Sequence, residues 1–151
     1  MVCKSNCQRN EKLHIKRCLE RLAPLEPRQV FVVDCFSTDG TQKIVKSFST
    51  NNSALTTNNY ALATNHSALT TNNYALTTNH YLIEHEWPGL QSVQFNWALD
   101  NLPVEAKWIL RIDADEWLTK ELIEEIKSRL PSLEDDVDGV VLKRRHYFCG
   151  R

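Results

Sequence analysis

The stretch that decides the fold is Val30-Phe31-Val32-Val33-Asp34, in which four consecutive apolar residues are followed by an aspartate. A short, continuous apolar run is typical of a strand that is buried on both faces of a parallel sheet. Before it, the pattern predicts an amphipathic helix that Pro24 closes. After it, residues 37–40 (STDG) form a turn that can cap a second helix. These residues therefore predict a helix–strand–helix unit.

The same alternation continues further along the chain. Strands are predicted at residues 81–83, 108–112 and 139–142, and helices at residues 90–102 and 119–130. Helices and strands that alternate in this way predict an α/β fold. Its mostly parallel, Rossmann-type sheet has helices on both faces. Residues 1–9 are polar and do not predict a strand.

One segment differs in composition from the rest. Residues 50–81 contain no Asp, Glu, Lys or Arg, and they repeat every seven residues, from TNNSALT at 50–56 to TNNYALT at 71–77. We interpret the segment as a low-complexity insertion that is mostly disordered, with a small β-rich stack as the alternative. Residues 1–49 and 82–151 are then two parts of one domain.

Composition narrows the classes of protein. The 18 Lys and Arg residues nearly balance the 19 Asp and Glu residues, which argues against a nucleic-acid partner. The sequence has no apolar run long enough for a membrane span and no signal-peptide core, so we expect a cytoplasmic protein. The five cysteines include no Cys-x-x-Cys pair, which argues against a structural zinc site and favours thiols in a reducing compartment.

Acidic residues follow two of the predicted strands. Asp34 and Asp39 come after the first apolar run, and Asp113, Asp115 and Glu116 come after residues 108–112. In parallel sheets, ligands bind beyond the carboxyl ends of the strands. Clustered carboxylates repel one another unless they are solvated or bind a cation, and hard oxygen ligands suit Mg²⁺ or Mn²⁺. Spacing alone leaves two interpretations open: a metal site, or carboxylates that cap the helix near residue 119 and stay in water.

Several motifs resemble a known family. Residues 32–41, VVDCFSTDGT, resemble the VVDxxSTDGT segment of family 2 glycosyltransferases, which have the GT-A nucleotide-sugar fold. Residues 109–116, ILRIDADE, resemble the strand and Asp-x-Asp motif of that family. The likeness extends to three further segments: residues 85–89, residues 94–99, and Asn10-Glu11 followed by Cys18-Leu19. The chain is most similar to the members that build lipopolysaccharide cores and other surface polysaccharides.

The resemblance implies an inverting, metal-dependent transfer of sugar from a nucleotide-diphospho-sugar to a glycan or lipid-linked acceptor. It implies that Asp34 and Asp39 contact the donor nucleoside and that Asp113 lies near the ribose and diphosphate. It also implies that Asp115, together with Asp113, binds Mg²⁺ or Mn²⁺. The basic residues 143–145 can meet the diphosphate or the inner face of a membrane, or stay solvated.

The chain also departs from the family pattern. The polar residues 1–9 predict that one edge of the nucleotide pocket is altered. The catalytic residues stay unknown, because the family's general base is expected beyond Arg151. For the same reason, the predicted GT-A-like fold is incomplete. The alternatives to a transferase are therefore an inactive, truncated remnant that at most binds the nucleotide-sugar, and a nucleotide-binding regulatory module.

Overall fold

The computed structural model describes residues 2–4, 11–48 and 78–147. The chain divides into two compact units, Met1–Thr119 and Lys120–Arg151. The acidic residues that the sequence analysis singled out all lie in the first unit. In the second, helix α4 (Lys120–Arg129) leads into a 3₁₀ turn at Leu130–Ser132.

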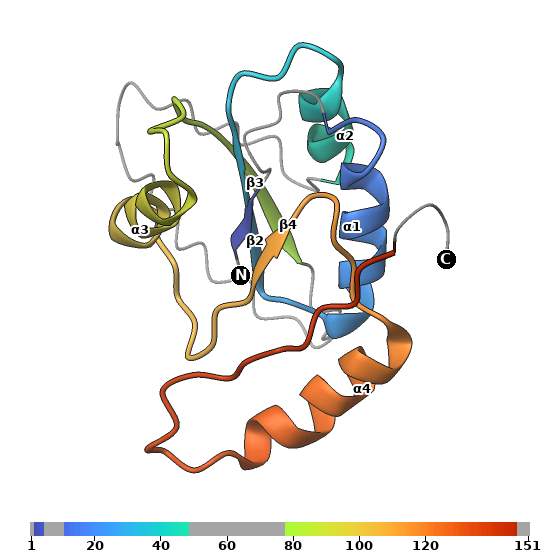
Figure 1. Ribbon diagram of the computed structural model, residues 1–151, viewed down its shortest axis with the longest axis vertical. Coiled ribbons are helices and arrows are strands. Elements are labelled where there is room, and N and C mark those ends of the chain that lie inside the picture. Colours follow the sequence, from blue (N-terminus) through green and yellow to red (C-terminus); the bar gives the residue numbers. More distant parts are fainter. Residues whose placement is uncertain (1, 5–10, 49–77, 148–151) are drawn as a thin grey trace, which may run out of the picture. The chain divides into compact units, whose positions relative to one another are not determined.

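The first unit contains a parallel sheet of four strands in the order β3-β2-β1-β4 (Figure 1). The strands are β1 (Val2–Lys4), β2 (Gln29–Asp34), β3 (Asn79–Glu84) and β4 (Arg111–Asp113). In the register, Lys4 is level with Val33 on one side and with Asp113 on the other. The prediction of a mixed α/β fold with a parallel sheet is confirmed.

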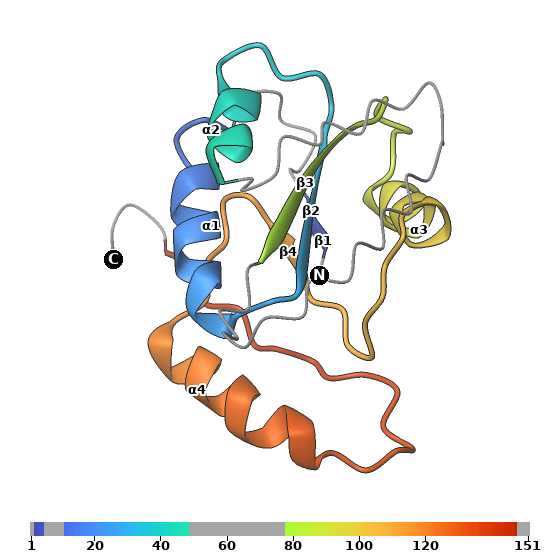
Figure 2. The ribbon, with the colours of Figure 1, turned by 180° about the vertical axis from the view of Figure 1, so that it is seen from behind.

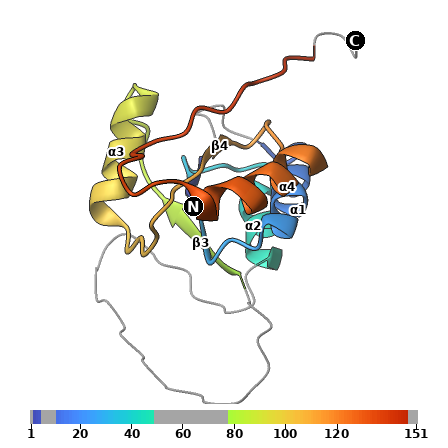
Figure 3. The same ribbon diagram turned by 90° about the horizontal axis from the view of Figure 1, so that it is seen from below.

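Helices lie on both sides of this sheet. Helices α1 (Ile15–Leu22) and α2 (Thr41–Phe48) lie on one side, and α3 (Gln91–Asn101) lies on the other (Figures 1, 2 and 3). Each was predicted within a few residues, and Pro24 ends α1 as expected, in a 3₁₀ turn at Ala23–Leu25. None of the described helices combines the length and the apolar character that crossing a membrane requires.

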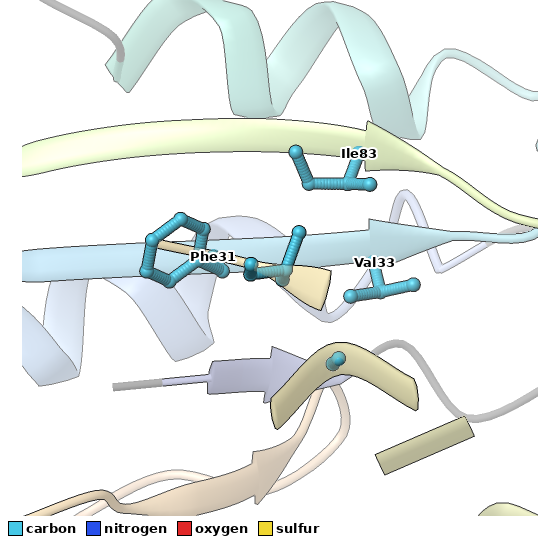
Figure 4. Close-up of a cluster of buried hydrophobic side chains, with 5 residues drawn as sticks. Phe31, Val33 and Ile83 are labelled. Atoms are coloured by element: carbon cyan, nitrogen blue, oxygen red, sulfur yellow. The ribbon is translucent and has the colours of Figure 1, made fainter. Parts of the chain in front are cut away.

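The core is built around β2, whose side chains are buried from Val30 to Asp34. Because successive strand residues point to opposite faces, Phe31 and Val33 share one face with each other. They form a buried cluster with Ile83, Ala98 and Leu102, which joins α3 to the sheet (Figure 4). The ring of Phe31 also stacks on Tyr81, with centroids 4.9 Å apart. The buried residues of α1 and α2, opposite this cluster, are Ile15, Cys18, Leu19, Leu22, Thr41 and Val45.

The amino-terminal prediction was wrong. Val2–Lys4 forms β1, which pairs with β2 and β4 and so lies inside the sheet. Three residues are too few to give a recognisable apolar run, and the pairing partners on both sides come from distant parts of the chain. Among the described residues, the order of elements therefore starts with β1 and ends with the 3₁₀ turn at Leu130–Ser132.

Two further strand predictions need correction. Residues 139–142 form no strand, and Val141 is 94% exposed. An apolar run without a neighbouring strand to pair with cannot complete its backbone hydrogen bonds as a sheet. The predicted strand at residues 108–112 is shorter and later, at Arg111–Asp113.

The repeat segment is described only at its end. β3 begins at Asn79, so the last partial copy of the repeat contributes to the sheet. The prediction that the repeats are mostly disordered falls on residues 50–77, outside the described residues. Phe48, which ends α2, and His80, in β3, have ring centroids 5.9 Å apart. The two points that flank the repeats are therefore neighbours in the fold.

Candidate functional site

The strand order places the predicted acidic residues at one edge of the sheet. Strand β2 lies next to β1 and β3 lies next to β2, whereas β4 pairs with the other side of β1. The carboxyl ends of β2 and β4, at Asp34 and Asp113, therefore flank β1, with their backbones about 10 Å apart, or two strand spacings. In doubly wound sheets, this point of reversal is where ligands bind.

Asp34 is fully buried, and protein groups occupy its carboxylate. Oδ2 accepts hydrogen bonds from the Ser37 backbone N–H at 2.8 Å and from the Gln42 side chain at 2.8 Å, and Oδ1 accepts one from the Ser37 hydroxyl at 2.6 Å. The same Gln42 amide donates to Glu84 at 2.7 Å. The Asp34 carboxylate thus fixes the turn that follows β2 and links it to the end of β3.

Asp39 joins this turn to two helices. Its Oδ1 accepts hydrogen bonds from the N–H of Thr41, at 2.9 Å, and from the Thr41 hydroxyl, at 2.6 Å, at the start of α2. Its Oδ2 accepts one from the Lys12 N–H, just before α1, at 3.0 Å. Burial pushes the pKa of Asp39 upward, but the hydrogen bonds from Thr41 and Lys12 outweigh it and hold the pKa below 3.8. The group is therefore ionised at neutral pH.

A tight turn presents the acidic residues after β4. The Asp113 N–H donates to the Glu116 carboxylate at 3.0 Å, and the Glu116 N–H donates to the Asp113 carbonyl at 3.0 Å. The Cys18 thiol of α1 lies 3.8 Å from the same carbonyl. Asp113 is buried, whereas Asp115 is exposed. The turn thus leaves the Asp115 side chain in solvent, whereas the Asp113 side chain is largely covered.

Glu11 is the residue of this site to which sequence reasoning gave no role. It precedes α1 and is only 6% exposed. Burial raises its pKa, the charge of Asp115 raises it further, His14 partly offsets this, and Asp39 and Asp113 add smaller upward effects. The charges of Asp39, Asp113 and Asp115 therefore all act on one buried carboxyl, and the N–H of Lys12, the residue after Glu11, binds Asp39. The only sequence signal was Asn10-Glu11 in the family resemblance, because burial of an acid cannot be recognised from composition.

The donor chemistry fits a cation that arrives with a phosphorylated ligand. Among residues 11–48 and 78–147, no three His, Cys, Asp or Glu side chains are placed to hold a metal ion together. Mg²⁺, however, is commonly held by one or two carboxylates, with substrate phosphates and waters as the remaining ligands. Asp113 and Asp115 can supply that pair of hard oxygen donors.

A second polar cluster lies beside this edge, on the α3 side of the sheet. The rings of His85 and Trp97 stack with centroids 3.6 Å apart, and the backbone N–H of His85 donates to the Asp34 carbonyl at 3.0 Å. The buried Gln94 amide lies 3.6 Å from the Cys35 sulfur. Burial lowers the pKa of His85, and Gln94 and Glu86 partly oppose the change. Cys18 and Cys35 are both buried and form no disulfide, which agrees with the expectation of thiols.

Comparisons of the chain with protein-family models, with curated proteins and with solved structures found no match. The resemblance to family 2 glycosyltransferases therefore stays a prediction from the motifs, and the geometry of the site is the independent evidence about function.

Proposed function

We propose that the chain is the nucleotide-sugar-binding part of a glycosyltransferase similar to family 2, with a GT-A-like fold. In this proposal the donor is a nucleotide-diphospho-sugar, the acceptor is a glycan or a lipid-linked sugar, and transfer inverts the anomeric centre. The observation that carries the proposal is the placement of two acidic segments on either side of β1, where the strand order reverses. Asp39 follows β2 and binds the backbone next to Glu11, and the turn with Asp113 and Asp115 follows β4.

The acidic turn would hold the metal. Asp113 and Asp115 are the proposed ligands of Mg²⁺ or Mn²⁺, and Glu116 keeps their turn closed through its two hydrogen bonds with Asp113. A bound cation supplies positive charge that offsets the diphosphate, so the nucleoside diphosphate is a better leaving group. Burial is the main cause of the raised pKa of Glu11, and the charge of Asp115 adds to it, as expected where negative charges repel one another until a cation binds.

The residues after β2 would position the nucleoside. The Asp34 carboxylate is buried, so in this proposal it acts through the turn that it fixes. Asp39 is partly exposed, just before the start of α2, so in this proposal it is the one of the two that can reach the ligand. We assign no described residue as the base that deprotonates the acceptor hydroxyl.

Calorimetry with a panel of nucleotide-diphospho-sugars, with and without Mn²⁺, tests the donor site. We expect binding only with metal, and Asp115→Asn should weaken it by roughly tenfold or more, because a neutral amide is a poor ligand for a hard cation. Asp100→Asn is the matched control, since Asp100 is an exposed aspartate at the end of α3. Equal affinity with and without Mn²⁺ would contradict the proposal.

A second measurement separates a working transferase from a chain that only binds the donor. Release of nucleoside diphosphate would be followed with a panel of donors and acceptors. Turnover within the usual enzyme range, about 1 per second or more, would establish transfer, whereas metal-dependent binding without turnover would support the binding-only alternative.

A further inference from the structure

The turn after β2 holds an aromatic residue in an unusual backbone conformation. Phe36 has φ of 57°, in the left-handed region, and Glu26 is the one other described residue besides glycine with a positive φ. Only glycine, and to a lesser degree Asn or Asp, adopts this region readily, because Cβ crowds the backbone there. Phe36 is therefore kept in a conformation that a different residue would adopt more easily.

Burial of the ring does not explain this conformation. Every residue from Val30 to Cys35 is buried, yet Phe36 is 47% exposed. The conformation is imposed by the turn itself, since the Asp34 carboxylate binds both the N–H and the hydroxyl of Ser37. The fully buried Asp34 thus holds Phe36 with part of its ring in solvent.

The place of Phe36 in the sheet is the third observation. Phe36 lies at the carboxyl end of β2, three residues before Asp39, on the sheet edge that also carries Asp113. Strained residues that the surrounding structure holds in place are concentrated at ligand-binding and catalytic sites. An exposed aromatic ring offers a flat apolar face, and nucleobases stack on such faces.

We propose that Phe36 is the platform on which the nucleobase of the donor stacks. The inference rests on the proposed function and adds the part of the ligand that Phe36 meets. In this arrangement the base lies over the turn after β2, and the diphosphate reaches toward the acidic turn after β4. Stacking accepts any base, because every base has a π-face, so Phe36 contributes affinity more than choice of base.

The test compares ligands that contain a nucleobase with one that does not. Uridine diphosphate and guanosine diphosphate contain it and inorganic diphosphate does not, and calorimetry with Mn²⁺ gives the affinity for each. Phe36→Asn keeps a residue that tolerates the left-handed region and removes the ring. We expect it to weaken nucleoside diphosphate binding by about 5- to 150-fold and to leave inorganic diphosphate binding unchanged. Phe36→Tyr should keep wild-type affinity.

Glu26→Asn is the matched control for the backbone. Glu26 has φ of 54° and lies just before the start of β2. The Glu26→Asn substitution therefore relieves comparable backbone strain at the other end of the same strand. Both Asn variants should keep or raise the Tm, and only Phe36→Asn should affect the nucleotide.

Three results would overturn the inference. Unchanged nucleoside diphosphate affinity in Phe36→Asn would show that the ring does not meet the base. An equal loss for nucleoside diphosphate and inorganic diphosphate would show that Phe36 acts on the site as a whole. If the wild-type chain bound no nucleoside diphosphate at all, the proposed function would fail together with the inference. If both the wild type and Phe36→Asn bound it equally well, only the inference would fail.

Discussion

Replacing Asp39 with alanine should destabilise the first unit in a way that depends on pH. The substitution removes three hydrogen bonds, two at the first residue of α2 and one to the backbone before α1. Loss of a capping side chain costs about 0.5–2 kcal/mol, and a hydrogen bond to a charged group contributes about 1.5–3 kcal/mol. Since the Asp39 side chain is partly exposed, we expect the free energy of unfolding to fall by an amount near the low end of the sum of these contributions, about 2–4 kcal/mol at neutral pH.

The pH dependence follows from the pKa of Asp39. The folded-state pKa lies below the ordinary value of 3.8, so the folded protein favours the ionised form. The stabilisation is then fully present above 3.8 and is lost as the pH falls through the folded-state value. The difference between wild type and Asp39→Ala should therefore shrink in strongly acidic solution.

Urea unfolding at neutral and acidic pH measures both effects. In thermal unfolding at neutral pH, the expected loss of stability lowers the Tm by about 5–15 °C, using about 2–4 °C per kcal/mol for a chain of this size. Asp39→Asn separates charge from geometry, because its amide oxygen can still accept from Thr41 while the charge is gone. A loss below about 0.5 kcal/mol at neutral pH, or one that persists unchanged well below pH 3.8, would refute the reasoning.

Three more predictions concern other contacts. The guanidinium of Arg17 lies 3.9 Å from the ring centroid of Trp117, and a double-mutant cycle with Arg17→Gln and Trp117→Leu should give a coupling of about 0.5–1 kcal/mol; no coupling would mean that the contact contributes nothing. The pKa of His85 is lowered from 6.5, so NMR titration should find more than half of this side chain neutral at pH 6.5, and stability should fall as the pH drops from 6.5 to its folded-state pKa; a midpoint above 6.5 would contradict this. Replacing residues 50–77 with a few Gly and Ser residues should leave the Tm unchanged or slightly higher, because the flanking elements are already neighbours; a decrease of more than several degrees would show that the repeats stabilise the fold.

The sequence predicted the parts of the fold that have long or strongly patterned signals. The apolar run at residues 30–33 became β2, and the segment between Pro88 and Pro103 became α3. β1 was missed because its three residues gain their place from pairing with two distant strands. The strand expected at residues 139–142 failed for the converse reason, since an apolar run is a strand only where a partner exists.

The site was predictable as a location and less so as an arrangement. The places of Asp39 after β2 and of Asp113 and Asp115 at and after the end of β4 put all three at the carboxyl ends of parallel strands, as the apolar runs before them predict. Burial of Glu11 and the left-handed conformation of Phe36 depend on tertiary packing and on the turn, which no local pattern encodes. A sequence pattern would favour glycine at such a position, so the phenylalanine gives no warning of it.

The closeness of Phe48 and His80 has a consequence for how the gene can change. Each repeat is a whole number of codons, so gaining or losing a copy leaves the reading frame intact. Because the described residues on either side of the segment are neighbours, the distance that its ends must span is the same for any number of copies. Related genes with different copy numbers can therefore encode the same sheet and the same acidic site, and sequencing this locus across isolates would reveal such length variants.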